Sequence, residues 1–117
     1  HLESGRRLAE GRNFEAAARE FQAAVELDPS NAIPHLYLGN VAFQQEQYEA
    51  ARGHFEMAAR LDPRNPGTLK NLGLTYVKLN RPADALRAFE AVLRAEPGDG
   101  QLRAEVDRLR VQLGTSK

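Results

Sequence analysis

The chain contains no cysteine among its 117 residues. It therefore forms no disulfide, offers no thiolate nucleophile and holds no sulfur-ligated metal. The absence leaves the compartment open, because a cysteine-free chain is equally suited to the cytoplasm and the periplasm. We expect a soluble protein in one of the two, and the sequence does not choose between them.

An excess of either charge is also missing, since 16 basic residues balance 16 acidic ones. No global field recruits nucleic acid or an anionic membrane, and we expect neither as a partner. No apolar run approaches membrane-spanning length, and no signal peptide is visible. The opening His1-Leu2-Glu3 matches what an affinity tag and cloning site leave behind. On that interpretation the chain is a piece of a longer protein.

Residues typical of catalytic sites are scarce. The three histidines, His1, His35 and His54, show neither i, i+4 metal spacing nor a partner cluster of acids. Gly98-Asp99-Gly100 follows an expected helix and lacks the strand and third glycine of a phosphate-binding loop, so it is interpreted as a linker and cap. The sequence predicts a protein that is not an enzyme and has no metal and no cofactor.

Four columns of identical residues, each repeating at 34 positions, are the most informative feature. They are Gly5, Gly39 and Gly73; Ala17, Ala51 and Ala85; Phe21, Phe55 and Phe89; and Pro29, Pro63 and Pro97. A period of 34 with helical patterning inside it is typical of stacked helix pairs. A glycine in mid-helix costs about 1 kcal/mol relative to alanine, so keeping it three times predicts close approach by another helix.

The fold predicted is all-α: an α-solenoid of three antiparallel helix pairs and one capping helix, in a single domain over 1–117. Repeat 1 covers about 1–31, repeat 2 about 32–65 and repeat 3 about 66–99. The expected helices are about 2–11, 14–27, 32–45, 48–61, 66–79 and 82–95. Asn31 and Asn65 are expected N-caps.

The capping helix is expected over about 101–113, with Asp99 as its N-cap. Its apolar residues form one narrow stripe, Leu102, Val106, Leu109 and Leu113. A one-sided helix is suited to closing a stack. The tail Gly114 to Lys117 is expected to fray.

The columns resemble the tetratricopeptide repeat (TPR) pattern W-x₂-L-G-x₂-Y, then A-x₃-F, then P. The Gly, Ala, Phe and Pro positions are occupied in all three units, whereas His1, His35 and Leu69 stand at the Trp position. The resemblance covers about Ser4 to Pro97. It implies a right-handed superhelix whose first helices line a concave face that binds a partner peptide. It thus implies a non-catalytic interaction scaffold or adaptor with a protein or peptide partner.

Helical geometry sets one face of each first helix apart from the packing residues. We call this the A-helix face and expect it to form the peptide-binding groove. Its candidate residues are Arg6, Leu36, Tyr37, Asn40, Phe43, Gln44, Lys70, Asn71, Leu74 and Lys78. On the first helix the equivalents also include Leu2, Ala9 and Glu10, and on the fifth Val77. In the alternative interpretation, Leu36, Phe43, Leu74 and Val77 are partly buried between adjacent first helices of the repeats, and their polar neighbours are merely solvated.

Some TPR domains bind the C-terminal carboxylate of heat-shock chaperones through a clamp of two lysines, two asparagines and one arginine. Starting from unit one, the five clamp positions hold Leu2, Arg6, Tyr37, Gly67 and Asn71, and starting from unit two they hold Leu36, Asn40, Asn71, Gln101 and Glu105. No position matches in the first register. In the second, both asparagines match, but every cation is missing and one is replaced by an acid, which argues against such a clamp.

Two further functions stay open. The array self-associates into a homo-oligomer, or it is a regulatory or targeting appendage of a larger protein.

Overall fold

The computed structural model describes residues 1–114, and its seven helices in that part of the chain divide between two compact units, His1–Arg64 and Asn65–Lys117. The first unit contains α1 (Leu2–Glu10), α2 (Phe14–Leu27), α3 (Ala32–Gln44) and α4 (Tyr48–Leu61). The second contains α5 (Pro66–Lys78), α6 (Pro82–Ala95) and α7 (Gly100–Gln112). The all-α prediction is confirmed. That residues 1–117 form one domain stays a prediction, and of the tail expected to fray, Gly114 to Lys117, residues 115–117 lie outside the described residues.

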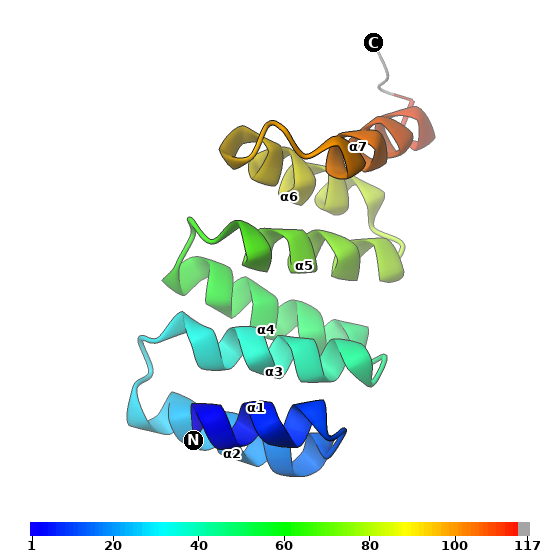
Figure 1. Ribbon diagram of the computed structural model, residues 1–117. Helices are drawn as coiled ribbons and strands as arrows, with labels where there is room; N and C mark the ends of the chain where they lie inside the picture. The colour runs from blue at the N-terminus through cyan, green and yellow to red at the C-terminus, as the bar shows by residue number, and fades with distance from the viewer. Residues whose placement is uncertain (115–117) are drawn as a thin grey trace. The chain divides into compact units, whose positions relative to one another are not determined.

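In the first unit, consecutive helices run in opposite directions and pack side by side (Figure 1). α1 also touches α3, so the first helices of the two repeats are neighbours. A cluster of buried apolar residues joins α2 to α3: Ala17, Phe21, Leu38 and Val41.

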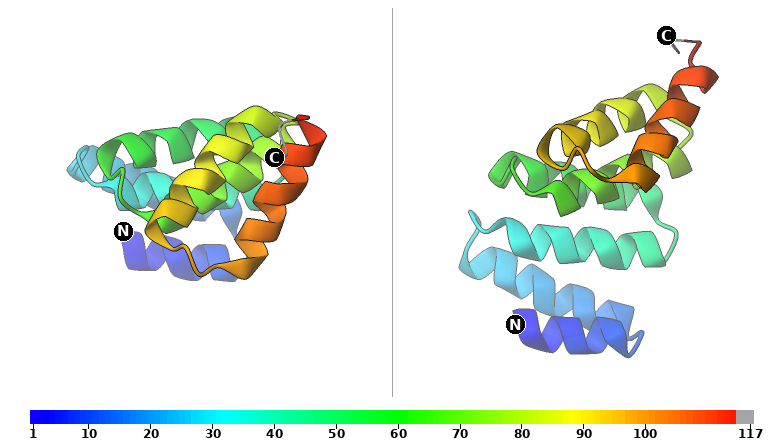
Figure 2. Two further views of the ribbon diagram at one scale, coloured as in Figure 1. Left: turned by 90° about the horizontal axis from the view of Figure 1, so that it is seen from above. Right: turned by 45° about the horizontal axis from the view of Figure 1, so that its top comes forward.

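In the second unit, α5 and α6 form an antiparallel pair and α7 packs against α6 (Figure 2). The apolar stripe of α7 is buried as predicted, with Leu102, Val106 and Leu109 each less than a tenth exposed. Asp99 caps this helix by accepting a hydrogen bond from the Leu102 backbone N–H at 3.0 Å. α7 therefore covers α6 with one face only, as a capping helix does.

The glycine column and the phenylalanine column form a single contact. A Cβ atom added to Gly39 would lie 2.5 Å from Cε1 of Phe55, and one added to Gly73 would lie 2.5 Å from Cε1 of Phe89. The rings of Phe55 and Phe89 are each 1% exposed. The sequence predicted close approach by another helix at each glycine, and the structure agrees. What approaches is the aromatic ring of the second helix in the same pair.

The helix ends show a fifth regularity that the residue types conceal. Arg12, Glu46 and Asn80, again 34 positions apart, each adopt positive φ, of 62°, 61° and 58°. The following backbone N–H closes a Schellman turn, as in Gln47 N to Ala42 O at 2.8 Å. These turns end α1, α3 and α5 one residue before the ends expected from sequence.

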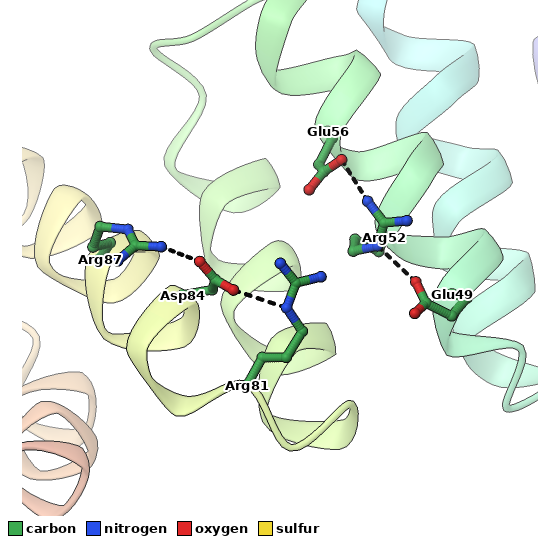
Figure 3. A network of polar contacts seen from close by, with 6 residues as sticks. All are labelled: Glu49, Arg52, Glu56, Arg81, Asp84 and Arg87. Atoms are coloured by element: carbon green, nitrogen blue, oxygen red, sulfur yellow. Dashed lines mark hydrogen bonds and ion pairs between the residues drawn. The ribbon is translucent and has the colours of Figure 1, made fainter. Parts of the chain in front are cut away.

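Both units carry ion pairs between side chains three or four residues apart in the sequence (Figure 3). In α4, Arg52 bridges Glu49 at 2.7 Å and Glu56 at 2.8 Å. In α6, Asp84 accepts from Arg81 at 2.8 Å and also pairs with Arg87. Such partly exposed i, i+3 and i, i+4 pairs stabilise a helix by a few tenths of a kcal/mol each, about 0.3–0.5.

Candidate functional site

A shallow pocket of about 170 Å³ lies on the first unit where α1, α2 and α3 meet. We call it the α1–α3 pocket. Six of its lining residues belong to the predicted A-helix face: Arg6, Ala9, Glu10, Tyr37, Asn40 and Gln44. The others are Phe21 and Val41.

The buried glycines position the polar side chains of this pocket. Arg6 and Asn40 directly follow Gly5 and Gly39, whose own positions face Phe rings of the second helices. Because successive residues of a helix are turned by about 100°, the residue after each glycine points away from the pair's core. The packing contact thus fixes where Arg6 and Asn40 stand.

Tyr37 supplies the aromatic wall. Its ring lies 5.2 Å from that of Phe21, centroid to centroid, with the planes tilted by 42°. Phe21 is itself 1% exposed and held against Gly5. The tyrosine ring is therefore fixed by a buried neighbour before any ligand arrives.

The charges of the pocket are mixed and local. Arg6 Nη1 lies 3.4 Å from Glu3 Oε2. Because the Arg6 side chain is 50% exposed, this ion pair holds the guanidinium only weakly. Glu10 adds a carboxylate, and Asn40 and Gln44 add amides. A guanidinium, a carboxylate and two amides beside an aromatic ring can bind the backbone and side chains of an extended peptide.

Two predicted residues of α3 do not line this pocket. The Phe43 ring packs edge-on against Tyr48, the first residue of α4, with centroids 5.2 Å apart and planes at 73°. Leu36 is half-buried. Phe43 therefore belongs to the contact at the α3–α4 turn.

On the second unit, the A-helix face of α5 is partly open. Leu74 is 44% exposed, Val77 is 39% exposed, and Lys78 is exposed. The backbone carbonyl of Asn71 accepts a hydrogen bond from Thr75 Oγ1 at 2.8 Å, within the helix. The burial of Leu74 and Val77 between adjacent first helices stays a prediction.

Lys70 has a partner that the sequence did not indicate. Its Nζ lies 3.2 Å from Oδ2 of Asp99, the N-cap of α7. The Leu102 backbone hydrogen bond, and after it the hydrogen bond from Lys70, lower the pKa of Asp99. Lys70 therefore helps to hold the start of α7 in place.

Sequence reasoning missed Phe21 and Val41 as lining residues: it assigned Phe21 to the packing column and gave Val41 no role. The signal was available for Val41, which directly follows Asn40 in α3. Within residues 1–114, the structure shows no group of three or more His, Asp or Glu side chains arranged to hold a metal ion. In the same part of the chain, every helix is too short or too polar to cross a membrane.

Comparison with known families now identifies the fold. Sequence profiles described as tetratricopeptide repeat match residues 2–66 and 38–114. The chain therefore belongs to the tetratricopeptide repeat family, whose members are generally non-catalytic interaction modules. No curated protein matches it in sequence.

Solved structures agree on the fold. The first TPR of Spaghetti (RPAP3), bound to the HSP90 peptide SRMEEVD, superposes with a TM-score of 0.89 at 18% identity, over 97% of this chain and 90% of that one. YrrB, a TPR protein with an unusual peptide-binding site, gives 0.89 at 27% identity, over 97% of this chain and 58% of that one. The second TPR domain of human RPAP3, with the HSP70 peptide SGPTIEEVD, gives 0.84 at 22% identity, over 92% and 90%.

Proposed function

We propose that this chain is a non-catalytic interaction scaffold that binds a peptide segment of a partner protein through its A-helix face. The observation that carries the proposal is the α1–α3 pocket, in which Arg6, Tyr37 and Asn40 converge from two first helices. Structural neighbours that bind peptides support it.

The physical basis is rigid display. Each first helix is held by a glycine–phenylalanine contact, and each pair is closed by a Schellman turn. The side chains after the glycines are thereby ordered before binding, so the partner segment bears most of the ordering cost. An extended segment with hydrogen-bonding backbone and polar side chains is suited to this surface.

The peptide differs from those of the chaperone-binding neighbours. The clamp positions hold Leu2, Arg6 and Tyr37 in the first repeats, and no register supplies the lysines. We therefore expect the segment to be held by amide and aromatic contacts in the α1–α3 pocket. Self-association and a regulatory or targeting role in a larger protein stay predictions.

Selection from a peptide library displayed on phage, against the immobilised protein, tests the proposal. Selected peptides should bind the wild type and lose about five- to tenfold in affinity to Asn40→Ala, because an amide that bonds the peptide backbone is worth about 1–1.5 kcal/mol. Gln22→Ala removes an amide from an exposed site on α2 and is the matched control.

Calorimetric titration of the selected peptides gives the affinities, and circular dichroism verifies that each variant stays folded. Peptides that bind Asn40→Ala and Tyr37→Ala as well as the wild type would move the site away from the α1–α3 pocket.

A further inference from the structure

A second pocket, on the other unit, is lined by three arginines. It has a volume of about 330 Å³ and lies between α6 and α7; we call it the α6–α7 pocket. Its lining residues are Glu90, Leu93, Arg94, Arg103 and Arg110. Three guanidinium groups against one carboxylate leave this wall with two excess positive charges (3 − 1), although the whole chain is neutral.

The arginines are only partly engaged. Arg110 Nη2 lies 2.7 Å from Glu90 Oε2, and its Nη1 lies 4.0 Å from Asp107 Oδ1. Arg103 Nη2 donates to the Pro97 carbonyl at 2.7 Å. Arg94 is exposed, and its side chain makes no hydrogen bond or ion pair with another residue of 1–114. Since a guanidinium carries five N–H donors, Arg94 and Arg103 keep donors directed at solvent.

The fold does not require these arginines. The same positions two repeats earlier lie between α2 and α3 and hold a glutamine, an acid, a histidine and an alanine. In chain order they are Gln22, Glu26, His35 and Ala42, which correspond to Glu90, Arg94, Arg103 and Arg110. The same helix arrangement is therefore built there without a single arginine.

The sequence of α7 also keeps this face open. Asp107 stands where α3 has Gly39 and α5 has Gly73. A Cβ at either glycine would collide with a phenylalanine ring 2.5 Å away. A helix therefore cannot pack onto α7 at Asp107 as α4 packs onto α3, and Arg103 and Arg110 are not positioned to become core residues.

We propose that the α6–α7 pocket binds a carboxylate-rich acidic segment of a partner protein, at a site separate from the α1–α3 pocket. The Glu90–Arg110 pair shows that a carboxylate fits among these guanidinium groups. Leu93 offers an apolar floor for the methylene groups of a glutamate side chain. Arg94 and Arg103 supply forked donors, which match carboxylate geometry and give charge-assisted hydrogen bonds.

Fluorescence anisotropy with a short labelled glutamate-rich peptide tests this site on the full chain. The pair Arg94→Gln with Arg103→Gln should weaken binding about tenfold or more, because two charge-assisted contacts are lost. The pair Arg87→Gln with Arg108→Gln removes the same charge from exposed sites on the same two helices, and should leave the affinity nearly unchanged. Added salt should weaken wild-type binding.

Further peptides and variants distinguish the alternatives. A matched glutamine peptide should not bind, and equal affinity for it would overturn the assignment. Tighter binding of a phosphoserine peptide or of inorganic phosphate would assign the pocket to a phosphoryl group instead. Equal losses in the two arginine pairs, or no saturable binding, would also overturn it.

One variant separates this inference from the proposed function. Asn40→Ala should leave glutamate-peptide binding intact. Loss of binding in Asn40→Ala would place the acidic peptide in the α1–α3 pocket, which would overturn the present inference and leave the proposed function standing.

Discussion

The helix pairs α3–α4 and α5–α6 share their central contact, and the positions at which they differ include one pair of facing residues beside it. His35 and His54 stand in the first pair where Leu69 and Ala88 stand in the second. The two imidazole rings lie 6.4 Å apart, centroid to centroid, with planes at 32°. Two aliphatic side chains and two ionisable rings thus occupy equivalent places in the same framework.

Comparison of the two helix pairs shows which contacts are common to both and which positions vary. Gly39–Phe55 and Gly73–Phe89 have the same geometry, with the same close approach of 2.5 Å to an added Cβ. The neighbouring positions accept either chemistry without a change in helix bounds. What changes is the response to pH: burial lowers the pKa of His35, and burial followed by the charge of His35 lowers the pKa of His54.

The largest effect is expected from substituting the glycine of the glycine–phenylalanine contact that the two pairs share. Gly39→Ala and Gly73→Ala should each cost about 3 kcal/mol, at the upper end of overpacking, because the opposing ring is fully buried. Urea denaturation of each variant gives the loss.

Gly53→Ala is the matched control, since an added Cβ there meets nothing within 4 Å. It should stabilise α4 by about 0.5–1 kcal/mol, the helix-propensity gain. Clearly unequal losses at Gly39 and Gly73 would show that the two pairs do not rely on one common contact.

A smaller effect is expected from replacing the two histidines of the first pair with the residues that stand at the same positions in the second. Above pH 6.5, the ordinary value for imidazole, His35 and His54 are neutral in both folded and unfolded chains. As the pH falls through 6.5, the unfolded chain takes up protons that the folded first unit resists, so folding stability is lost. His35→Leu with His54→Ala, the residues of the second pair, should remove this loss and raise stability at neutral pH by about 1 kcal/mol.

Hydrogen exchange above and below pH 6.5 resolves the two units. In the wild type, protection should fall with acid in α3 and α4 more than in α5 and α6. His1 and its partner Glu20 are present in both proteins, so they do not affect the comparison. An unchanged acid response in the double variant would rule out the histidine pair as its source.

The smallest effect concerns the turns. Glu46 and Asn80 both adopt positive φ, near 60°. Asparagine tolerates this conformation better than glutamate. Glu46→Asn should therefore stabilise the first unit, and Asn80→Glu should destabilise the second, each by about 0.5 kcal/mol. Thermal melts of the two variants should shift in opposite directions; shifts in one direction would contradict the assignment.

Particular residues show how far the sequence leads. The helices from Phe14, Tyr48 and Pro82 begin and end where the pattern predicted, because apolar periodicity and the Asp-Pro and Glu-Pro breaks are local signals. The left-handed turns at Arg12, Glu46 and Asn80 left no such signal, since three unlike residues serve one backbone role. Among candidate site residues, Arg6, Tyr37, Asn40 and Gln44 do meet, and Phe43 turns to Tyr48 instead.

The sequence alone determined the family, the helix pairs and the columns of residues that pack them, because a 34-residue period repeats each local signal for a helix or a turn three times. Tertiary structure decided the partners of individual side chains. Phe21 packs against Gly5, Lys70 pairs with Asp99, and three arginines line one pocket. A repeat fixes which face a residue occupies. The repeat cannot fix which residue of another helix that side chain contacts. This depends on how side chains of different size pack together.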